Sequence, residues 1–204
     1  MGYDTQCNTP LCNIDVGLVV TGSFCTFNSF AGYISELADA VRSVTPILSE
    51  SALTFNTKFN TAVERKGLLE QVTGVKAITT INAAEVIGPG QLFDIMVVAP
   101  CTGNTLAKLA NGITDTTATM AIKAHLRNNR PVVIGISSND ILGQNAKNLG
   151  VLLNTKNYYF IPFYQDDPEG KEKSITFKCE LLMNTIAKAL DGKQLQPIMQ
   201  EAAL

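Results

Sequence analysis

Short apolar runs alternate along the chain with segments whose apolar residues recur at helical spacing. The first run, at 14–20, ends in a Thr-Gly-Ser turn, and Ile34, Leu37, Ala38 and Val41 then fall on one helical face. Continuous apolar runs are typical of strands that are covered on both faces. Strands are therefore predicted at 14–20, 46–48, 76–81, 95–99, 131–136 and 158–162.

Helices are predicted between and after these strands, so the fold class is α/β. A mainly parallel six-stranded sheet with helices on both faces follows from the alternation. Gly74 is expected to end a helix at 60–72 in the left-handed conformation. Thr114 or Asp115 is expected to cap a later helix, and Gly88-Pro89-Gly90 is predicted to be a loop.

Length and composition predict one domain with a small-molecule or protein partner. The 204 residues show no linker, so a single domain is predicted at 14–204, after an N-terminal arm at 1–13. The 16 basic and 18 acidic residues argue against a nucleic-acid groove. No apolar segment approaches the roughly 20 residues that span a bilayer. Five cysteines without a C-x-x-C pair, together with one histidine, predict reduced intracellular thiols and no metal site.

Polar turns follow four of the predicted strands. In a parallel sheet the strand ends meet at one edge, where ligands bind. The turns offer hydroxyl and amide groups but no Lys or Arg, and they read Thr21-Gly22-Ser23, Ser49-Glu50-Ser51, Cys101-Thr102-Gly103-Asn104-Thr105 and Ser137-Ser138-Asn139. With the free N–H groups of helix starts, they suit a single phosphate on a polar, largely neutral ring system. Flavin mononucleotide (FMN) fits this description, as do other phosphorylated ligands.

Each turn also has a purely structural explanation. Ser, Thr and Asn cap helices, each contributing about 1 kcal/mol. Cys101 is expected to pack as a small apolar residue, whereas Cys25, in a first helical turn, is a candidate reactive thiol. His125, near Arg127 and Arg130, is expected to complement a helix dipole as a cation. The glycine patterns of triphosphate and dinucleotide sites are absent from the sequence.

Two of these turns resemble a known family. The turn at 21–23 and the segment 100–115, which reads PCTGNTLAKLANGITD, resemble the flavoprotein family of homo-oligomeric flavin-containing cysteine decarboxylases. The resemblance to one branch of that family covers nearly the whole chain after about residue 14. Its motifs, which are highly specific as a set, lie at 128–133, 135–137, 139–140, 155–157, 162–163, 165–168 and 194–198.

The resemblance implies a three-layer α/β/α Rossmann-like (flavodoxin-like) fold, noncovalent FMN and trimer-based homo-oligomers. It implies oxidation of dihydrodipicolinate, or of its hydrated precursor, to dipicolinate in the cytoplasm of the mother cell of a sporulating bacterium. The implied partner is a second subunit, termed A, which is similar to a nicotinamide-dependent dehydrogenase. By position, the cofactor would contact Gly22, Ser23, Ser49, Ser51, Pro100, Cys101, Thr102, Gly103, Asn104, Thr105, Ser137 and Ser138.

The sequence departs from the family's decarboxylases in one respect. Those enzymes carry a catalytic histidine before the fourth strand, whereas residues 82–87 read NAAEVI, so decarboxylation is disfavoured. No strand-end loop carries an obvious acid or base, so catalytic residues stay unassigned and a noncatalytic flavin-binding scaffold is the alternative. Lys108, Arg127 and Arg130 are candidate partners for substrate carboxylates. The missing histidine also disfavours a flavin-dependent prenyl-transfer enzyme, and a nicotinamide site with Glu50 on a ribose hydroxyl lacks the glycine fingerprint.

Overall fold

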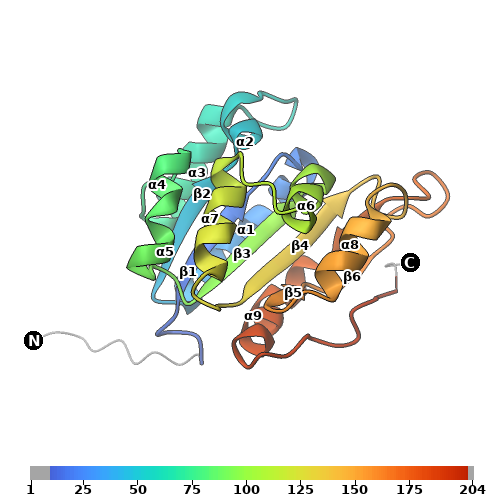
Figure 1. The fold of residues 1–204 in the computed structure, drawn as a ribbon. Helices are drawn as coiled ribbons and strands as arrows, with labels where there is room; N and C mark the ends of the chain where they lie inside the picture. Colours follow the sequence, from blue (N-terminus) through green and yellow to red (C-terminus); the bar gives the residue numbers. More distant parts are fainter. Residues whose placement is uncertain (1–9, 202–204) are drawn as a thin grey trace, which may run out of the picture.

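A seven-stranded sheet forms the middle layer of the computed structural model, which describes residues 10–201 (Figure 1). The strand order is β2-β1-β3-β4-β7-β6, and β5 pairs with β4 beside this path. Strands β1 to β5 pair in parallel, whereas β7 is antiparallel to β4 and β6. The strands are β1 (Asp15–Val20), β2 (Ser43–Leu48), β3 (Ile95–Cys101), β4 (Val132–Ser138), β5 (Tyr158–Phe160), β6 (Phe163–Tyr164) and β7 (Ile175–Phe177).

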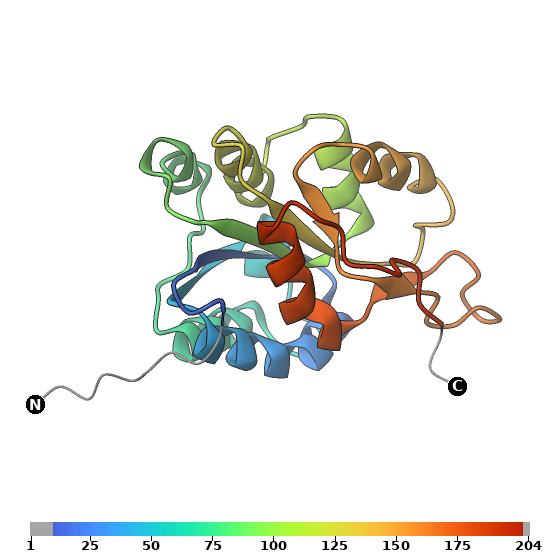
Figure 2. The same cartoon turned by 90° about the horizontal axis from the view of Figure 1, so that it is seen from below.

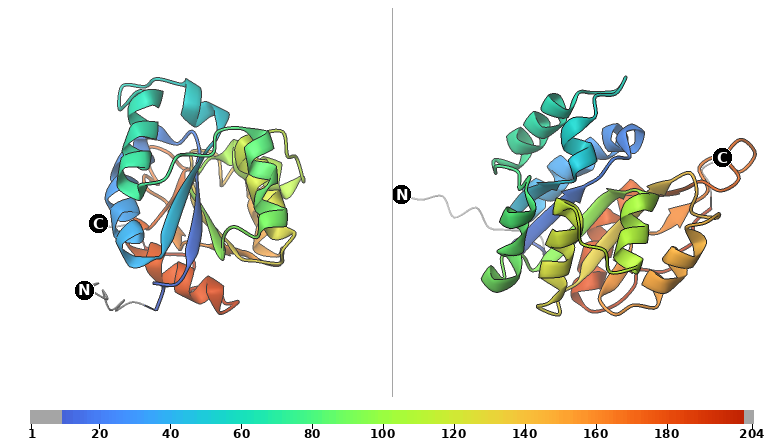
Figure 3. Two further views of the ribbon diagram at one scale, coloured as in Figure 1. Left: turned by 90° about the vertical axis from the view of Figure 1, so that its left-hand side faces the viewer. Right: turned by 45° about the horizontal axis from the view of Figure 1, so that its top comes forward.

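Helices cover both faces of this sheet, as Figures 2 and 3 show. One buried cluster joins the sheet to α1, α2, α3 and α9, and a second joins it to α4 through α8. The helices are α1 (Phe24–Ala40), α2 (Glu50–Thr54), α3 (Ala62–Thr73), α4 (Ile81–Glu85), α5 (Ile87–Gly90), α6 (Gly103–Ala110), α7 (Thr117–Leu126), α8 (Ala146–Leu153), the 3₁₀ turn η1 (Cys179–Leu181) and α9 (Leu182–Leu190). The predicted three-layer α/β/α fold is confirmed.

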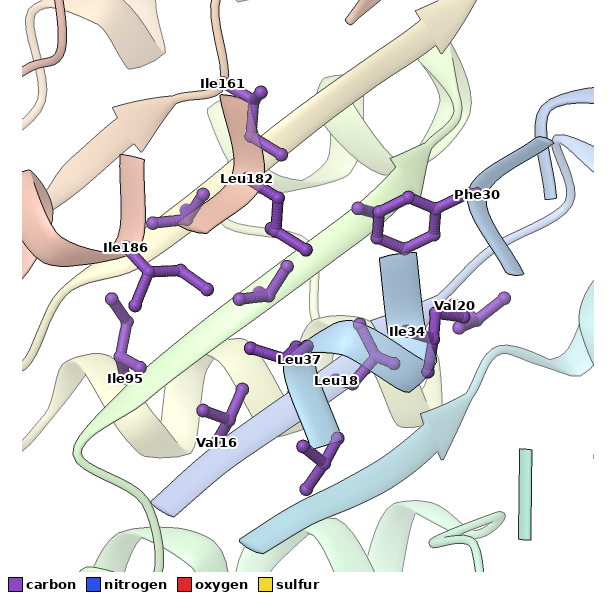
Figure 4. Packing of buried hydrophobic residues seen from close by; sticks show 14 of the residues in the cluster. Val16, Leu18, Val20, Phe30, Ile34, Leu37, Ile95, Ile161, Leu182 and Ile186 are labelled. Carbon is purple, nitrogen blue, oxygen red and sulfur yellow. The ribbon is translucent and has the colours of Figure 1, made fainter. Parts of the chain in front are cut away.

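Period-two alternation along β1 assigns its side chains to the two layers. Val16, Leu18 and Val20 point to the α1 face, where they pack with Ile34 and Leu37 (Figure 4). Burying a side chain of this size contributes about 1.5–3 kcal/mol. All seven residues of β3 are buried, as expected of a central parallel strand. The core therefore fixes the strand ends, and with them the position of the polar turns.

Three local predictions are wrong. Residues 76–81 form only an isolated bridge between Ile78 and Ile47, and Thr80 instead caps α4. Gly88-Pro89-Gly90 belongs to the short helix α5 rather than to a loop. Helix α7 is capped by Thr116, whose Oγ1 accepts a hydrogen bond from the Thr119 backbone N–H at 3.1 Å, and not by Thr114 or Asp115.

Gly74 ends α3 with φ 68°, as predicted, because a residue without Cβ adopts this conformation at little cost. Residues 1–9 of the predicted N-terminal arm lie outside the described residues. Leu11 is buried in the α1-side cluster. Within residues 10–201, no helix combines the length and apolar character needed to cross a membrane.

Candidate functional site

Two hollows adjoin at the edge where the parallel strands end. The first, of about 460 Å³, is lined by the turn after β1, the start of α1, the end of β4 and part of β7. The second, of about 450 Å³, is lined by the same turn, α2 and the start of α6. Gly22, Phe24 and Thr102 line both hollows. Their volumes fall in the range of small-molecule sites.

Most of the residues predicted to contact a cofactor line these hollows. Those at the first hollow are Gly22, Ser23, Thr102, Ser137 and Ser138. Those at the second are Gly22, Ser49, Ser51, Thr102, Asn104 and Thr105. Separate strand ends therefore converge as the sheet topology requires. Contact of these residues with a cofactor stays a prediction.

A buried hydroxyl ties the turn after β1 to the loop after β3. Thr21 Oγ1 donates to the Pro100 carbonyl at 2.7 Å and accepts from the Thr102 backbone N–H at 3.0 Å. Thr21 is 1% exposed, so these two contacts satisfy a hydroxyl that water does not reach. Pro100 therefore contributes a structural acceptor here and lines neither hollow.

Three hydroxyls meet in the wall of the first hollow. Ser137 Oγ lies 2.8 Å from Ser23 Oγ and 2.6 Å from Thr26 Oγ1. Ser23 sits at the N-cap position of α1 but its side chain makes no capping hydrogen bond. The first-turn N–H groups of α1 are thus not satisfied by this side chain, which leaves them suited to an anionic group.

The capping explanation holds for two other turns. Ser49 Oγ accepts from the Ala52 N–H, and Thr102 Oγ1 accepts from the Thr105 N–H, each at 3.3 Å. These hydroxyls begin α2 and α6. Both residues still line the second hollow. Ser49 Oγ can offer its own proton to a ligand, whereas Thr102 Oγ1 donates to Thr105 Oγ1 at 3.1 Å.

Cys101 and Gly103 lie behind the surface of the hollows. Burial raises the pKa of the Cys101 thiol to about 12, so it packs as the expected small apolar residue. A Cβ added at Gly103 would lie 2.5 Å from Asp140 Oδ1 and 2.8 Å from Ser138 Oγ. Gly103 is therefore required for close packing of α6 against the loop after β4. Neither residue lines a hollow.

Each hollow has one lysine at its wall. Lys171 lines the first, with its Nζ 3.7 Å from the Asp166 carboxylate, a distance too long for a hydrogen bond. Lys108 lines the second and pairs closely with Asp115 at 2.7 Å. Of the three predicted carboxylate partners, only Lys108 reaches the hollows.

Arg130 and Arg127 lie elsewhere. The Arg130 guanidinium donates to the carbonyls of Gln91 and Phe93, which precede β3 and so mark the opposite edge of the sheet. Arg127 lines a separate hollow beside α6 and α7. Neither is placed to bind a ligand at the strand ends.

Glu50 is occupied by the start of α7. Its carboxylate accepts from the Thr117 backbone N–H at 2.9 Å and from Thr117 Oγ1 at 3.0 Å. A negative charge at a helix N-terminus is stabilised by the dipole. Oε1 of Glu50 is therefore engaged at the start of α7, although the residue also lines the second hollow.

His125 has the expected structural role but not the expected charge. It is 1% exposed, and its Nε2 donates to the Pro131 carbonyl at 3.0 Å. Burial lowers the pKa of His125 to about 4, so the ring is neutral near pH 7. The predicted cation at the helix end is therefore wrong.

The cysteines divide into two kinds. Cys25, Cys101 and Cys179 are free thiols, whereas Cys12 is disulfide-bonded, which contradicts the prediction of reduced thiols at that position. Cys25 is exposed and lines the first hollow. The described residues contain no cluster of His, Cys, Asp and Glu that could hold a metal ion.

Several wall residues were missed from the sequence. Phe24, Thr57, Phe59 and Lys171 line the first hollow, and Phe55 lines the second. Phe24 directly follows a predicted contact residue, so its position in the sequence was a usable signal. The other four come from loops that only the tertiary fold brings to the strand ends.

Comparison with known proteins identifies the class. A family model described as Flavoprotein matches residues 5–191. The chain therefore belongs to the flavoprotein family. Within it, the chain is a homologue of the B subunit of dipicolinate synthase: it is 47% identical over 186 residues to that protein from Bacillus subtilis (strain 168), covering 91% of this chain and 93% of the relative.

Solved structures of related proteins agree with this family assignment. The B subunit of dipicolinate synthase from Bacillus halodurans C superposes with a TM-score of 0.86 at 40% identity, over 95% of this chain and 99% of that chain. The FMN-dependent cysteine decarboxylase SpaF superposes with a TM-score of 0.63 at 20% identity, over 87% and 95% of the two chains. The second likeness shows a shared fold alone. The predicted family is confirmed.

Proposed function

We propose that the chain binds FMN across the two hollows and acts with a dipicolinate synthase A subunit to oxidise dihydrodipicolinate, or its hydrated precursor, to dipicolinate. One observation carries the proposal: two hollows of small-molecule size meet at Phe24, and hydroxyl and amide groups line their walls. Homology to a dipicolinate synthase component supports the reaction, and membership of the flavoprotein family supports the cofactor.

The residues present fit FMN. A phosphate can take hydroxyl and backbone N–H donors at the start of α1 without a lysine. Gly22 faces both hollows, and a Cβ there would lie 3.3 Å from Ser51 Cβ, so glycine keeps this wall open. The half-buried Phe24 offers an apolar surface for a ring.

The chain's own residues would bind and orient the substrate. Oxidation of the dihydropyridine ring removes two electrons and two protons, and bound FMN would supply the acceptor for the electrons. Lys171 is loosely paired, so its ammonium can bind a substrate carboxylate at little cost in lost interactions. The hydroxyls of Ser23, Thr26 and Ser137 can hold or pass on a proton at the wall of the first hollow.

Lys171 provides a test of substrate binding. Lys171→Gln should raise KM roughly tenfold with a smaller change in kcat, because the lost charge contributes to binding rather than to the electron transfer. Lys173→Gln, on the same loop but outside the first hollow, is the matched control and should leave KM within about twofold. Initial-rate assays of the reconstituted A–B complex measure both. An unchanged KM for Lys171→Gln would remove this residue from the substrate site.

FMN itself is tested by reconstitution. The flavin-free chain should bind about one FMN per subunit, and the A–B complex should form dipicolinate only when FMN is restored. Turnover at the full rate without flavin would exclude FMN from the reaction. A chain that binds no FMN would contradict the proposed cofactor.

A noncatalytic scaffold is the second candidate. No histidine lines either hollow among residues 10–201, and Glu50 and Lys108 are committed to neighbouring groups. The lack of a histidine at the hollows also disfavours a flavin-dependent decarboxylase. Assaying the A subunit alone discriminates: full activity without this chain supports the scaffold, whereas no activity supports a shared site.

A homo-oligomer built from trimers is part of the proposal. Phe55 and Phe59 are 59% and 45% exposed although they line the hollows. Neighbouring Val63 is 81% exposed. An apolar surface beside a site is typical of a subunit contact.

A further inference from the structure

Arg65 of α3 is a buried cation without a carboxylate partner in the described part of the chain. The residue is 1% exposed and ranks among the largest fully buried side chains. None of the ion pairs among residues 10–201 includes Arg65. Arginine remains protonated in proteins, so this is a full positive charge. Buried charges are normally paired, because an uncompensated one is costly.

Neutral groups satisfy most of the guanidinium's donors. Nη1 donates to the Ala52 carbonyl at 2.5 Å, and Nη2 donates to the Phe55 carbonyl at 3.3 Å and to Asn60 Oδ1 at 2.8 Å. Nε is buried without a partner. Carbonyl dipoles at the end of α2 offset part of the charge but do not neutralise it.

Phe24 connects this charge to the site. The Arg65 guanidinium carbon lies 4.2 Å from the centroid of the Phe24 ring, a cation–π contact. The same side chain lines both hollows. Arg65 also holds the Phe55 carbonyl and the Asn60 side chain, at the two ends of a loop whose Thr57 and Phe59 line the first hollow. The positive charge thus lies directly behind the shared wall of the hollows.

We propose that Arg65 is the buried counter-charge for an anionic ligand at the strand ends, acting through the Phe24 ring. The inference rests on the proposed function, since the anion in question is the phosphate of FMN. The strand-end turns carry no Arg or Lys of their own, so a cation behind the wall supplies attraction that these turns lack. Arg65 is a positioning residue and does not touch the ligand.

Asn60→Asp tests the charge while keeping the contact with Arg65, and it gives up only the exposed hydrogen bond that Asn60 Nδ2 donates to Asn28 Oδ1 at 2.8 Å. The substitution is nearly isosteric and places a carboxylate at the existing 2.8 Å contact with Nη2. It should lower FMN affinity about tenfold, because the positive charge would already be neutralised, and leave the affinity for riboflavin, which lacks the phosphate, within about twofold. The Tm of the ligand-free protein should rise, because the buried cation gains a partner. Fluorescence titrations and thermal melts measure these changes.

Asn28→Asp is the matched control. Asn28 Oδ1 accepts from Asn60 Nδ2 at 2.8 Å, and Asn28 is exposed, so this carboxylate is solvated and does not touch Arg65. Its flavin affinities and Tm should stay close to the wild type. Arg65→Gln should also weaken FMN more than riboflavin, and Arg65→Lys should retain most of the FMN affinity.

Equal losses of FMN and riboflavin affinity in Asn60→Asp would show a merely structural role and overturn the inference, as would unchanged FMN affinity. If the wild-type chain binds no FMN, the proposed function fails. In that case the thermal melts still test the inference by themselves. A Tm that does not rise in ligand-free Asn60→Asp shows that Arg65 needs no counter-charge.

Discussion

Burial, rather than position at a helix end, decides the charge of His125. His125 occupies the last turn of α7, where a cation would be favourable, yet its surroundings keep the ring neutral. Asp15 shows the opposite case: hydrogen bonding from Arg42 lowers the pKa of its carboxyl, which lies near the surface. Neither group lines a hollow, so we expect both to act on stability.

His125 gives stability a predictable dependence on pH. The unfolded chain binds a proton near pH 6.5, whereas the folded chain binds it only near pH 4. The free energy of unfolding should therefore be fully retained above pH 6.5 and should fall by up to about 3 kcal/mol as the pH drops to 4. Denaturant titrations of wild type and His125→Gln across this range measure the difference. Parallel profiles for the two proteins would contradict a neutral buried ring.

Most of the contact residues predicted from the sequence line the hollows, because small polar residues at the ends of buried runs must meet at one sheet edge. Sequence reasoning could not locate Arg65, since the segment Glu64-Arg65-Lys66 has the composition of an exposed helix surface. Nor could it foresee that His125 is neutral. The burial of Arg65 and the neutral state of His125 both depend on which segments, distant in sequence, pack over each side chain.

At the scale of elements, the site depends on how α6 and α8 approach the end of β4. Asp140 accepts from Ser138 Oγ at 2.7 Å and from Asn145 Nδ2 at 2.6 Å, and Gly103 packs directly against all three side chains. The first residue of α6 thus fits a polar network that also supports a wall of the first hollow.

Gly103→Ala should be destabilising by about 1–3 kcal/mol, because the added methyl overpacks this contact. Gly67→Ala is the matched control, since its Cβ would enter open space in the middle of α3 and should stabilise by about 0.5–1 kcal/mol. Urea unfolding midpoints compare the two. A Gly103→Ala protein as stable as the wild type would mean that the α6 start is not tightly packed.

The errors in predicted elements have a common origin. Residues 76–81 contain β-branched residues typical of a strand, but only Ile78 finds a partner strand, and Thr80 caps a helix. Strands β6 and β7 have two and three residues. Segments this short carry little periodicity of their own. The pairing of β7 with β4 and of β6 with β7 is set by the tertiary fold, whereas the long buried strands β1, β3 and β4 were recognisable by themselves.

At the scale of the whole molecule, the exposed apolar surface beside the hollows gives the last prediction. Phe55, Phe59 and Val63 follow one another from the end of α2 into α3. If this surface joins subunits, Val63→Glu buries a charge in the contact and should convert the oligomer to monomers. FMN affinity should fall at the same time, since Phe55 and Phe59 line the hollows.

Val151→Glu provides the comparison. Val151 is 50% exposed on α8, which covers the opposite face of the sheet from α3, so the same substitution there should change neither mass nor FMN affinity. Sedimentation velocity gives the mass, and fluorescence titration gives the affinity. Loss of FMN affinity in a Val63→Glu protein of unchanged mass would mean that the surface shapes the site within one subunit. A joint loss of both would mean that the assembled protein completes the site, because the hollows open onto the surface that the subunits share.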